Sequence, residues 1–305
     1  MSLLKVVYHQ EYDLRLGAHV FPSVKFRMIR DRLVAEKIVA AEEILTPTEA
    51  SDEQLLLVHT PDWVSRFRDG TLGIHELVRL ELPWSKELVR GFYLSAGGSI
   101  LCGRLALEQG GAYNVGGGFH HAFPAHGEGF CAIHDVAVAI RTLKHEGLIE
   151  RAMVVDCDVH DGNGTAYIFQ DDPSVFTLSI HQYNNYPAEK PPSTVDIHLE
   201  DGVGDEEYLP KLRQAYEPAL AEFRPNIVYY VAGADPYFDD QLGGLKLTME
   251  GLRRRDELVL GKARAASIPF VVTLAGGYAR DVEDTVTIQA NTAVVAEEVL
   301  RGEKG

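Results

Sequence analysis

The sequence of 305 residues predicts an α/β fold, with a mostly parallel sheet and helices on both of its faces. Short apolar runs alternate with longer segments of helical spacing over almost the whole chain, which is the pattern of β-α-β units. Five of the apolar runs end directly in glycines or ionisable residues, and ligands bind beyond the carboxyl ends of strands in open α/β sheets. The sequence shows no internal repeat or linker, so we expect a single domain over residues 1–305.

The predicted strands are short and apolar and comprise residues 5–8, 112–115, 153–155, 175–180, 227–231 and 270–274. The predicted helices comprise residues 24–41, 86–107, 134–146, 165–170, 205–222, 248–266 and 281–301. Gly97 and Gly98 interrupt the second of these helices, and we expect them to allow close packing against a neighbouring element. A proline-rich stretch at 186–192 is predicted to be a surface loop.

The composition of the chain argues against several classes of protein. Hydrophobic residues make up 46% of the chain, enough for a substantial core, and no apolar run approaches the roughly 20 residues that span a bilayer. The first eight residues lack the plan of a signal peptide, so we expect a cytoplasmic protein without a membrane partner. The net charge of −16 argues against nucleic acid as a partner. Three cysteines without a Cys-x-x-Cys pair argue against a disulfide framework or a cysteine-rich zinc site.

The most informative segment follows the predicted strand at 153–155. Asp156, Asp158 and His160 stand at alternate positions, which point to the same side of an extended backbone. Burying three unpaired ionisable groups costs several kcal/mol unless something compensates, and a divalent metal is the simplest compensation. The Asp-x-His pair supplies one oxygen and one nitrogen donor, which suits zinc or a similar transition metal.

Four other predicted strands also end in unusual residues. Three glycines precede His120 and His121, and glycines let the backbone approach a ligand closely. Asp235 follows the predicted strand at 227–231. Tyr278 follows a pair of glycines after the predicted strand at 270–274. His181 ends the fourth strand, and we expect a structural role for it. The carboxyl ends of parallel strands meet at one edge of a sheet, so we expect the other groups to gather there.

Together these residues could carry out metal-assisted hydrolysis of an amide. Asp158, His160 and Asp235 would supply three ligands and leave open positions for water and substrate, as catalytic metal sites do. The metal would acidify the bound water and polarise a carbonyl group. His120 or His121 could take a proton from the water and return one to the leaving amine.

Three further residues could support this reaction. Tyr278 could donate a hydrogen bond to the carbonyl oxygen as it becomes an oxyanion. Asp156 could orient His120, as carboxylates near metal sites commonly orient histidines. Asn163 could accept a hydrogen bond from His121.

In these motifs the chain resembles the histone deacetylase superfamily of zinc-dependent amidohydrolases. The matching segments occur in the family's order and comprise residues 117–122, 129–131, 156–164, 178–181, 201–208, 233–235 and 276–278. The resemblance implies an arginase–deacetylase fold with zinc held by Asp158, His160 and Asp235. Ligand type alone does not separate Zn2+ from Fe2+.

The resemblance also implies roles for the remaining site residues. His121 would be the general base and acid, His120 its electrostatic neighbour, and Tyr278 the group that binds the acyl oxygen. The implied substrate tunnel is lined by Phe130, Leu242, Gly118 and Gly277. An implied structural potassium ion takes its ligands from Asp156, Asp158, His160, Ser179 and Ile180.

The sequence departs from many members of the superfamily at Asn163, where they carry Asp. A neutral partner stabilises a protonated His121 less, which lowers the pKa of that histidine relative to those members. Asn163 and residues 241–244 are most similar to the class IV branch and its bacterial relatives. We therefore expect a metal-dependent deacylase that removes acetyl or longer acyl groups from N-acyl-lysine in a peptide or protein, or from an acylated polyamine.

Two other hypotheses come from different classes. An arginase-type ureohydrolase with two manganese ions would enlist Asp156 and Asp161, but it would leave His120, His121 and Tyr278 without a clear role. A non-catalytic module that binds a nucleotide or an acyl ligand would use the glycines at 116–118. The Gly-x-Gly-x-x-Gly spacing is absent, however, because a histidine occupies the third glycine position.

Overall fold

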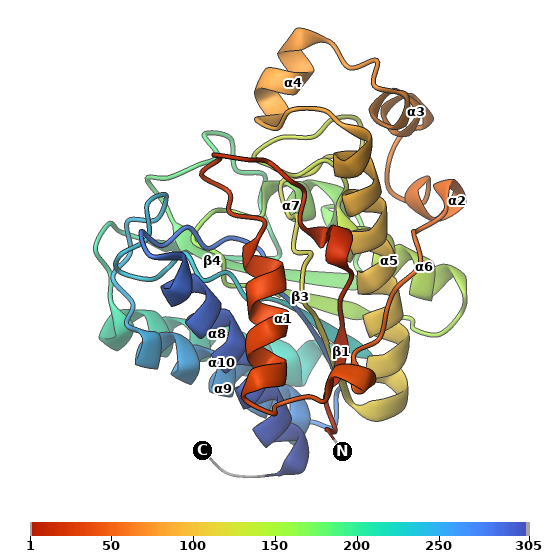
Figure 1. Cartoon of the computed structure of the whole chain (residues 1–305). Helices are drawn as coiled ribbons and strands as arrows, with labels where there is room; N and C mark the ends of the chain where they lie inside the picture. Colours follow the sequence, from red (N-terminus) through yellow and green to blue (C-terminus); the bar gives the residue numbers. More distant parts are fainter. Residues whose placement is uncertain (1, 303–305) are drawn as a thin grey trace.

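A seven-stranded sheet forms the centre of the computed structural model, which describes residues 2–302 (Figure 1). The strand order is β1-β2-β7-β6-β3-β4-β5, and all neighbouring strands are parallel. The strands are β1 (Lys5–Val7), β2 (Gly111–Asn114), β3 (Ala152–Asp156), β4 (Val175–Gln182), β5 (Val195–Leu199), β6 (Ile227–Val231) and β7 (Phe270–Thr273). The predicted α/β fold with a parallel sheet is confirmed.

Helices cover both faces of this sheet, as predicted (Figure 1). One side carries α5 (Lys86–Gln109) and α6 (Asp135–His145), and the other carries α1 (Lys25–Ala35), α8 (Asp205–Phe223), α9 (Met249–Ala265) and α10 (Val282–Arg301). The shorter helices are α2 (Asp52–Leu55), α3 (Pro61–Asp69), α4 (Ile74–Leu80) and α7 (Asn163–Phe169). Because both faces are covered, strands β2, β3, β6 and β7 are buried at every position, which explains their continuous apolar sequences.

None of the helices in residues 2–302 has both the length and the apolarity needed to cross a membrane.

The glycine pair in α5 allows the close packing that the sequence predicts. A Cβ atom on Gly97 would overlap the carbonyl oxygen of Thr48, and a Cβ atom on Gly98 would overlap the hydroxyl of Tyr12. Only glycine therefore fits at these two helix positions, where the N-terminal segment crosses α5.

The helix predicted over residues 24–41 is shorter than expected. It ends at Ala35, because Lys37 adopts the left-handed conformation with φ of 60°. The amide of Ile38 then donates to the carbonyl oxygen of Leu33 at 2.9 Å, which closes the end of the helix and turns the chain away. Apolar residues continue beyond this turn at helical spacing, so the periodicity alone extends the prediction too far.

Several short elements are not anticipated from the sequence. The edge strand β5 alternates apolar residues with Asp196 and His198, which is a strand signal, but the run is short and partly exposed. Helix α3 has its N-cap at Thr60 and proline at its first position, which is a recognisable start for a helix.

The strand order explains why distant sequence motifs meet. Strands β2, β7, β6 and β3 are consecutive in the sheet, and all four run in the same direction. The loops that follow them carry residues 116–121, 275–278, 232–235 and 157–162. These four loops therefore leave the same edge of the sheet side by side, as ligand-binding loops do in α/β folds.

Candidate active site

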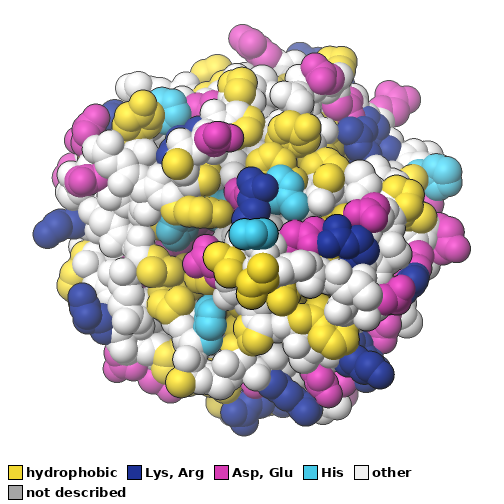
Figure 2. Space-filling view, turned by 90° about the horizontal axis from the view of Figure 1, so that it is seen from above, with side chains coloured by type: hydrophobic (Ala, Val, Ile, Leu, Met, Phe, Trp, Pro, Cys, Tyr) yellow, Lys and Arg dark blue, Asp and Glu magenta, His cyan; other side chains and the backbone are white. Residues whose placement is uncertain are grey.

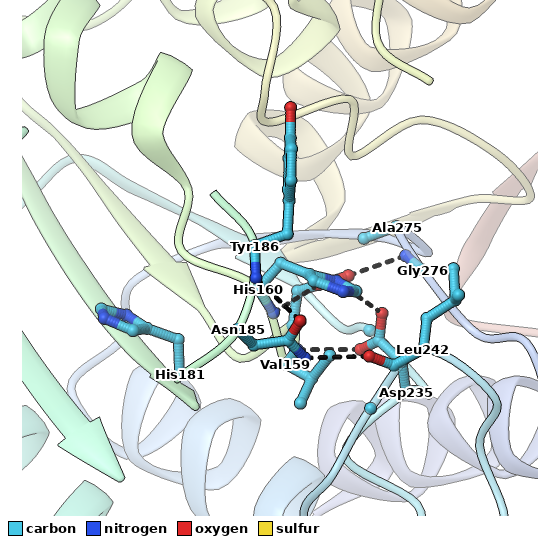
Figure 3. Close-up of polar contacts among 12 residues, drawn as sticks. Val159, His160, His181, Asn185, Tyr186, Asp235, Leu242, Ala275 and Gly276 are labelled. Atoms are coloured by element: carbon cyan, nitrogen blue, oxygen red, sulfur yellow. Dashed lines mark hydrogen bonds and ion pairs between the residues drawn. The ribbon is translucent and has the colours of Figure 1, made fainter. Parts of the chain in front are cut away.

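Asp158, His160 and Asp235 form a buried group of potential metal ligands. One ligand atom of each lies within 4.8 Å of the other two. The Nδ1 atom of His160 lies 3.0 Å from Asp158 Oδ1 and 3.4 Å from Asp235 Oδ2. The loops after β3 and β6 thus bring together the three side chains that the sequence marks as ligands (Figure 3).

Backbone amides orient the two carboxylates in this group. Gly276 N donates to Asp158 Oδ2 at 2.8 Å, and Val159 N donates to Asp235 Oδ1 at 2.8 Å (Figure 3). Within residues 2–302, Asp235 Oδ2 accepts no hydrogen bond, although Asp235 is 0% exposed. A buried carboxylate oxygen directed at an imidazole and a second carboxylate is a donor arrangement that suits a cation.

Two glycines leave the space around these carboxylates open. A Cβ atom on Gly233 would lie 2.6 Å from Asp158 Oδ2, and one on Gly276 would overlap Asp235 Oδ2. Burial and the nearby charge of Asp158 raise the pKa of Asp235 to about 7, because two buried carboxylates repel each other. A divalent cation would relieve this repulsion, so the residues present fit a metal ion with nitrogen and oxygen ligands.

The side chain of Asp156 turns away from the three ligand groups and contacts His120. Strand β3 ends at Asp156, so the strict alternation expected from the sequence stops there. Asp156 Oδ2 lies 2.7 Å from His120 Nδ1. Burial opposes a charge on His120, but the carboxylates of Asp156 and Asp158 outweigh it and raise the pKa of His120 to about 9. His120 is therefore positively charged at neutral pH.

The neighbouring His121 has the opposite electrostatic environment. Its Nδ1 atom lies 2.8 Å from Asn163 Oδ1. Burial, together with the charges of His120 and His160, lowers the pKa of His121 well below its usual value. His121 is therefore neutral at pH 7 and can accept a proton, while its neighbour carries a charge. Environments that separate the pKa values of two adjacent groups in this way are typical of acid–base sites.

Glu128 extends this hydrogen-bond chain, and the sequence motifs alone do not single it out. Its Oε1 atom accepts from Asn163 Nδ2 at 2.7 Å, which fixes the amide so that its oxygen faces His121. The Glu128 carboxylate also accepts from Arg79 Nε at 2.8 Å. Glu128 directly precedes the matching segment at 129–131, and its burial beside the site becomes visible only in the folded chain.

A narrow cavity leads to the ligand group. Phe21, Gly118, Phe130 and Tyr278 line it together with both neighbouring histidines. Gly276 lines the cavity in place of the expected Gly277, whose Cβ position faces Thr285 and Ala234 instead. Leu242, also expected in the tunnel, is not among the lining residues; its carbonyl oxygen accepts from Asn185 Nδ2 at 2.9 Å.

Three more residues that the sequence does not single out hold the walls of this cavity. Asp240 Oδ2 accepts from Tyr278 N at 2.6 Å and so fixes the loop that carries this tyrosine. Lys25 is fully buried, and its Nζ atom donates to the carbonyl oxygen of Ala275 at 2.9 Å. The ring of Tyr186 lies edge-on to His121, with a centroid distance of 4.9 Å.

The molecular surface adds the wider setting. Seen from above, histidine side chains lie near the middle of this face, among hydrophobic, basic and acidic side chains (Figure 2).

Comparison with known proteins identifies the family. The model of the histone deacetylase domain matches residues 19–294. The chain belongs to the histone deacetylase family. An uncharacterised protein of Picosynechococcus sp. is 43% identical over 282 residues, covering 92% of this chain and 94% of that protein. Histone deacetylase 2 of Arabidopsis thaliana is 33% identical over 303 residues, covering 94% of this chain and 78% of that protein.

An archaeal relative and a solved structure agree with this assignment. A probable deacetylase of Archaeoglobus fulgidus is 30% identical over 291 residues, covering 90% of this chain and 80% of that protein. The crystal structure of the HDA15 HD domain superposes with a TM-score of 0.80 at 23% identity, over 99% of this chain and 89% of that chain, which supports the fold. These histone deacetylase relatives support deacetylase-type hydrolysis, and they do not favour the arginase-type alternative.

Proposed function

We propose that the protein is a metal-dependent deacylase that hydrolyses the amide of an N-acyl-lysine in a peptide or protein, or of an acylated polyamine. The observation that carries the proposal is the buried group of Asp158, His160 and Asp235 beside His120 and His121, whose pKa values are shifted in opposite directions by their surroundings. These three residues would hold zinc or iron. When bound, the metal would acidify a water molecule and polarise the acyl carbonyl.

The residues of the chain would divide the proton transfers between them. Neutral His121 would take the proton of the attacking water at Nε2 and deliver it to the leaving amine, because its Nδ1 faces Asn163. Charged His120, held by Asp156, would stabilise the negative charge that develops next to it. Tyr278 would donate its hydroxyl proton in a hydrogen bond to the carbonyl oxygen of the substrate.

Residues 156–160 would also contribute to a structural potassium site. Asp156 pairs with Ser179 in the sheet register, so the side chain and backbone oxygens of these two residues lie on adjacent strands. Asp158, His160 and Ile180 would supply the remaining oxygens. Stabilisation by KCl but not by LiCl in a thermal unfolding assay would support this ion, and equal melting temperatures in both salts would contradict it.

A fluorogenic lysine panel that varies only the acyl group tests the proposed activity, with N-acetylpolyamines as a second substrate class. We expect amine release that a chelator abolishes and that added zinc or iron restores. His121→Ala should lose nearly all activity, whereas His75→Ala, which removes an exposed histidine on α4, should keep it. Full activity in His121→Ala, or in chelated protein shown to be metal-free, would refute the proposal.

A further inference from the structure

A second cluster of metal-ligating side chains lies toward the β4–β5 edge of the sheet. Asp161, His181 and Asp196 each place one ligand atom within 4.8 Å of the other two. His181 belongs to β4, Asp196 to the edge strand β5, and Asp161 to the loop after β3. In Figure 3 His181 lies apart from Asp235, and no polar contact joins it to the other residues drawn. The cluster is thus distinct from the candidate catalytic group.

The distances around the imidazole of His181 match those between ligands of one metal ion. Its Nε2 atom lies 3.2 Å from Asp161 Oδ2 and shares a hydrogen bond of 2.9 Å with Nδ1 of His198, so a metal ion here would replace the proton between the two rings. Atoms bound to zinc at about 2.0–2.1 Å in tetrahedral geometry are about 3.3 Å apart. On the other side of the ring, Nδ1 lies 2.8 Å from Ser179 Oγ. When Nδ1–H donates to this hydroxyl, the Nε2 lone pair points at Asp161, as in metal sites where a second hydrogen bond orients the histidine.

Within residues 2–302, three of the four carboxylate oxygens of Asp161 and Asp196 accept no hydrogen bond, which points to a ligand. Within residues 2–302, neither side-chain oxygen of Asp161 accepts a hydrogen bond, although this residue is only 1% exposed. Asp196 Oδ2 accepts from the amide of Ser193, but Asp196 Oδ1 is buried without a hydrogen bond within the same part of the chain. A carboxylate oxygen facing a nitrogen lone pair is repelled unless a proton or a metal cation lies between them.

Lys190 lies near the cluster, but its ammonium group makes no hydrogen bond to these carboxylates. Lys190 Nζ donates to the carbonyl oxygens of Asn185 and Pro187, so its hydrogen bonds are made to its own loop. Asp196 and His198 also line a cavity of about 620 Å³ on the surface of this edge. This cavity thus opens onto the outer pair of the cluster, Asp196 and His198.

We propose that Asp161, His181 and Asp196, with His198 as the outermost ligand, bind a transition metal ion such as Zn2+ that is separate from the catalytic metal. With His198 added to the three clustered residues, two carboxylate oxygens and two imidazole nitrogens would complete a tetrahedral set, as in a structural zinc site. The ion fastens the edge strand β5 to β4 and to the loop after β3. It also anchors the segment between β4 and β5 that carries Tyr186 over His121.

Metal counting in matched variants tests this site. Metal-free full-length protein is titrated with ZnCl2 in a constant concentration of KCl, passed through a desalting column and assayed for zinc per chain. We expect two equivalents in the wild type, one in Asp196→Asn and one in Asp235→Asn. Glu200→Gln, an exposed change just beyond β5, should retain two. Equal zinc content in the wild type and Asp196→Asn would overturn the proposal.

Thermal unfolding provides a readout that does not depend on activity. Zinc should raise the melting temperature of Asp235→Asn, which keeps the second site, and should not raise that of the Asp196→Asn/Asp235→Asn double variant. If zinc shifts the melting temperatures of Asp235→Asn and of the double variant equally, the second site is overturned. This comparison does not depend on how efficiently each variant folds. His198→Asn, at an exposed position, should weaken zinc retention at this site by about tenfold or more, and unchanged retention would remove His198 from the ligand set.

The proposed activity is tested separately in the same samples. A wild-type chain that hydrolyses an acyl-lysine reporter with one zinc equivalent refutes only the second site. A chain with two equivalents that hydrolyses no acylated amine refutes only the deacylase. A second ion that is lost in Asp196→Asn, with Asp156 intact, also separates this site from an arginase-type binuclear centre.

Discussion

Replacing Glu128 by alanine tests how His121 is prepared for proton transfer. Glu128 Oε1 accepts from Asn163 Nδ2 at 2.7 Å, and Asn163 Oδ1 lies 2.8 Å from His121 Nδ1. Without the carboxylate, the NH2 group loses its acceptor, and the backbone amide of Gly164, which donates to Asn163 Oδ1 at 3.0 Å, opposes rotation of the side-chain amide less than both contacts together do. Rotation would present the NH2 group to the imidazole. The Nδ1 atom would then be an acceptor, and Nε2 would carry the proton that it should receive from water.

The structure also sets the size of the effect. A buried hydrogen bond to a charged group contributes about 1.5–3 kcal/mol, and about 1.4 kcal/mol corresponds to a tenfold change in rate. Glu128→Ala should therefore lower kcat/KM by about 10- to 100-fold while the catalytic metal stays bound. Glu128→Gln should recover part of this loss, because the glutamine carbonyl can still accept from the amide of Asn163.

The assay is kcat/KM on the best acyl-lysine reporter, with metal content measured on the same preparation. Glu81→Ala is the matched control, because Glu81 lines the same cavity of about 860 Å³ as Glu128 and Asn163 but makes no side-chain hydrogen bond to either of them. It should keep kcat/KM within about twofold of the wild type. Metal-loaded Glu128→Ala protein with the kcat/KM of the wild type would show that the chain through Asn163 does not control His121.

Three further predictions concern the oxyanion contact of Tyr278, the space that Gly276 leaves beside the metal ligands, and the stability of the protein in acid. Tyr278→Phe should lower kcat by about 100-fold, close to 3 kcal/mol, with metal content unchanged, and unchanged kcat would exclude an oxyanion contact. Gly276→Ala should lose the catalytic metal, because the new Cβ atom would overlap Asp235 Oδ2. The control is Gly261→Ala on α9, where a Cβ atom meets open space. This variant should keep the metal and gain up to about 1 kcal/mol of stability. Burial lowers the pKa of His59 from 6.5 to about 4. As pH falls, this histidine therefore takes up a proton in the unfolded chain before it does so in the folded chain. The free energy of unfolding should fall by about 3 kcal/mol as pH drops from 6.5 toward 4. His59→Gln should remove this part of the pH dependence in urea unfolding, and an unchanged slope would contradict it.

Local sequence patterns predicted most of the fold. The strands were recognisable because a parallel sheet with helices on both faces buries them fully, which selects continuous apolar runs. The edge strand β5 was harder to recognise, because its exposed positions admit Asp196 and His198 and interrupt the apolar run. The end of α1 was also missed, since the left-handed turn at Lys37 is made by a residue type that favours helix.

The residues of the candidate site also divide into those that local sequence patterns reveal and those that only the folded chain reveals. Asp158, His160 and Asp235 were recognisable because each directly follows a strand at an edge where ionisable groups are otherwise unexpected. Glu128 and Lys25 were not, because their burial depends on segments far away in the sequence. The roles of the tunnel residues likewise depended on loop conformation, and Gly276 rather than Gly277 faces the cavity.

The sequence by itself determined the α/β architecture and the chemical character of the residues at the carboxyl edge of the sheet, because secondary structure and strand ends depend on neighbours along the chain. Only the tertiary structure decided which of these groups share an environment. The charge of His120, the neutrality of His121 and the unpartnered oxygens of Asp161 all arise from burial and from contacts across the sheet. Electrostatic energies depend on distance and on exclusion of water, and neither is encoded in the local pattern of residues.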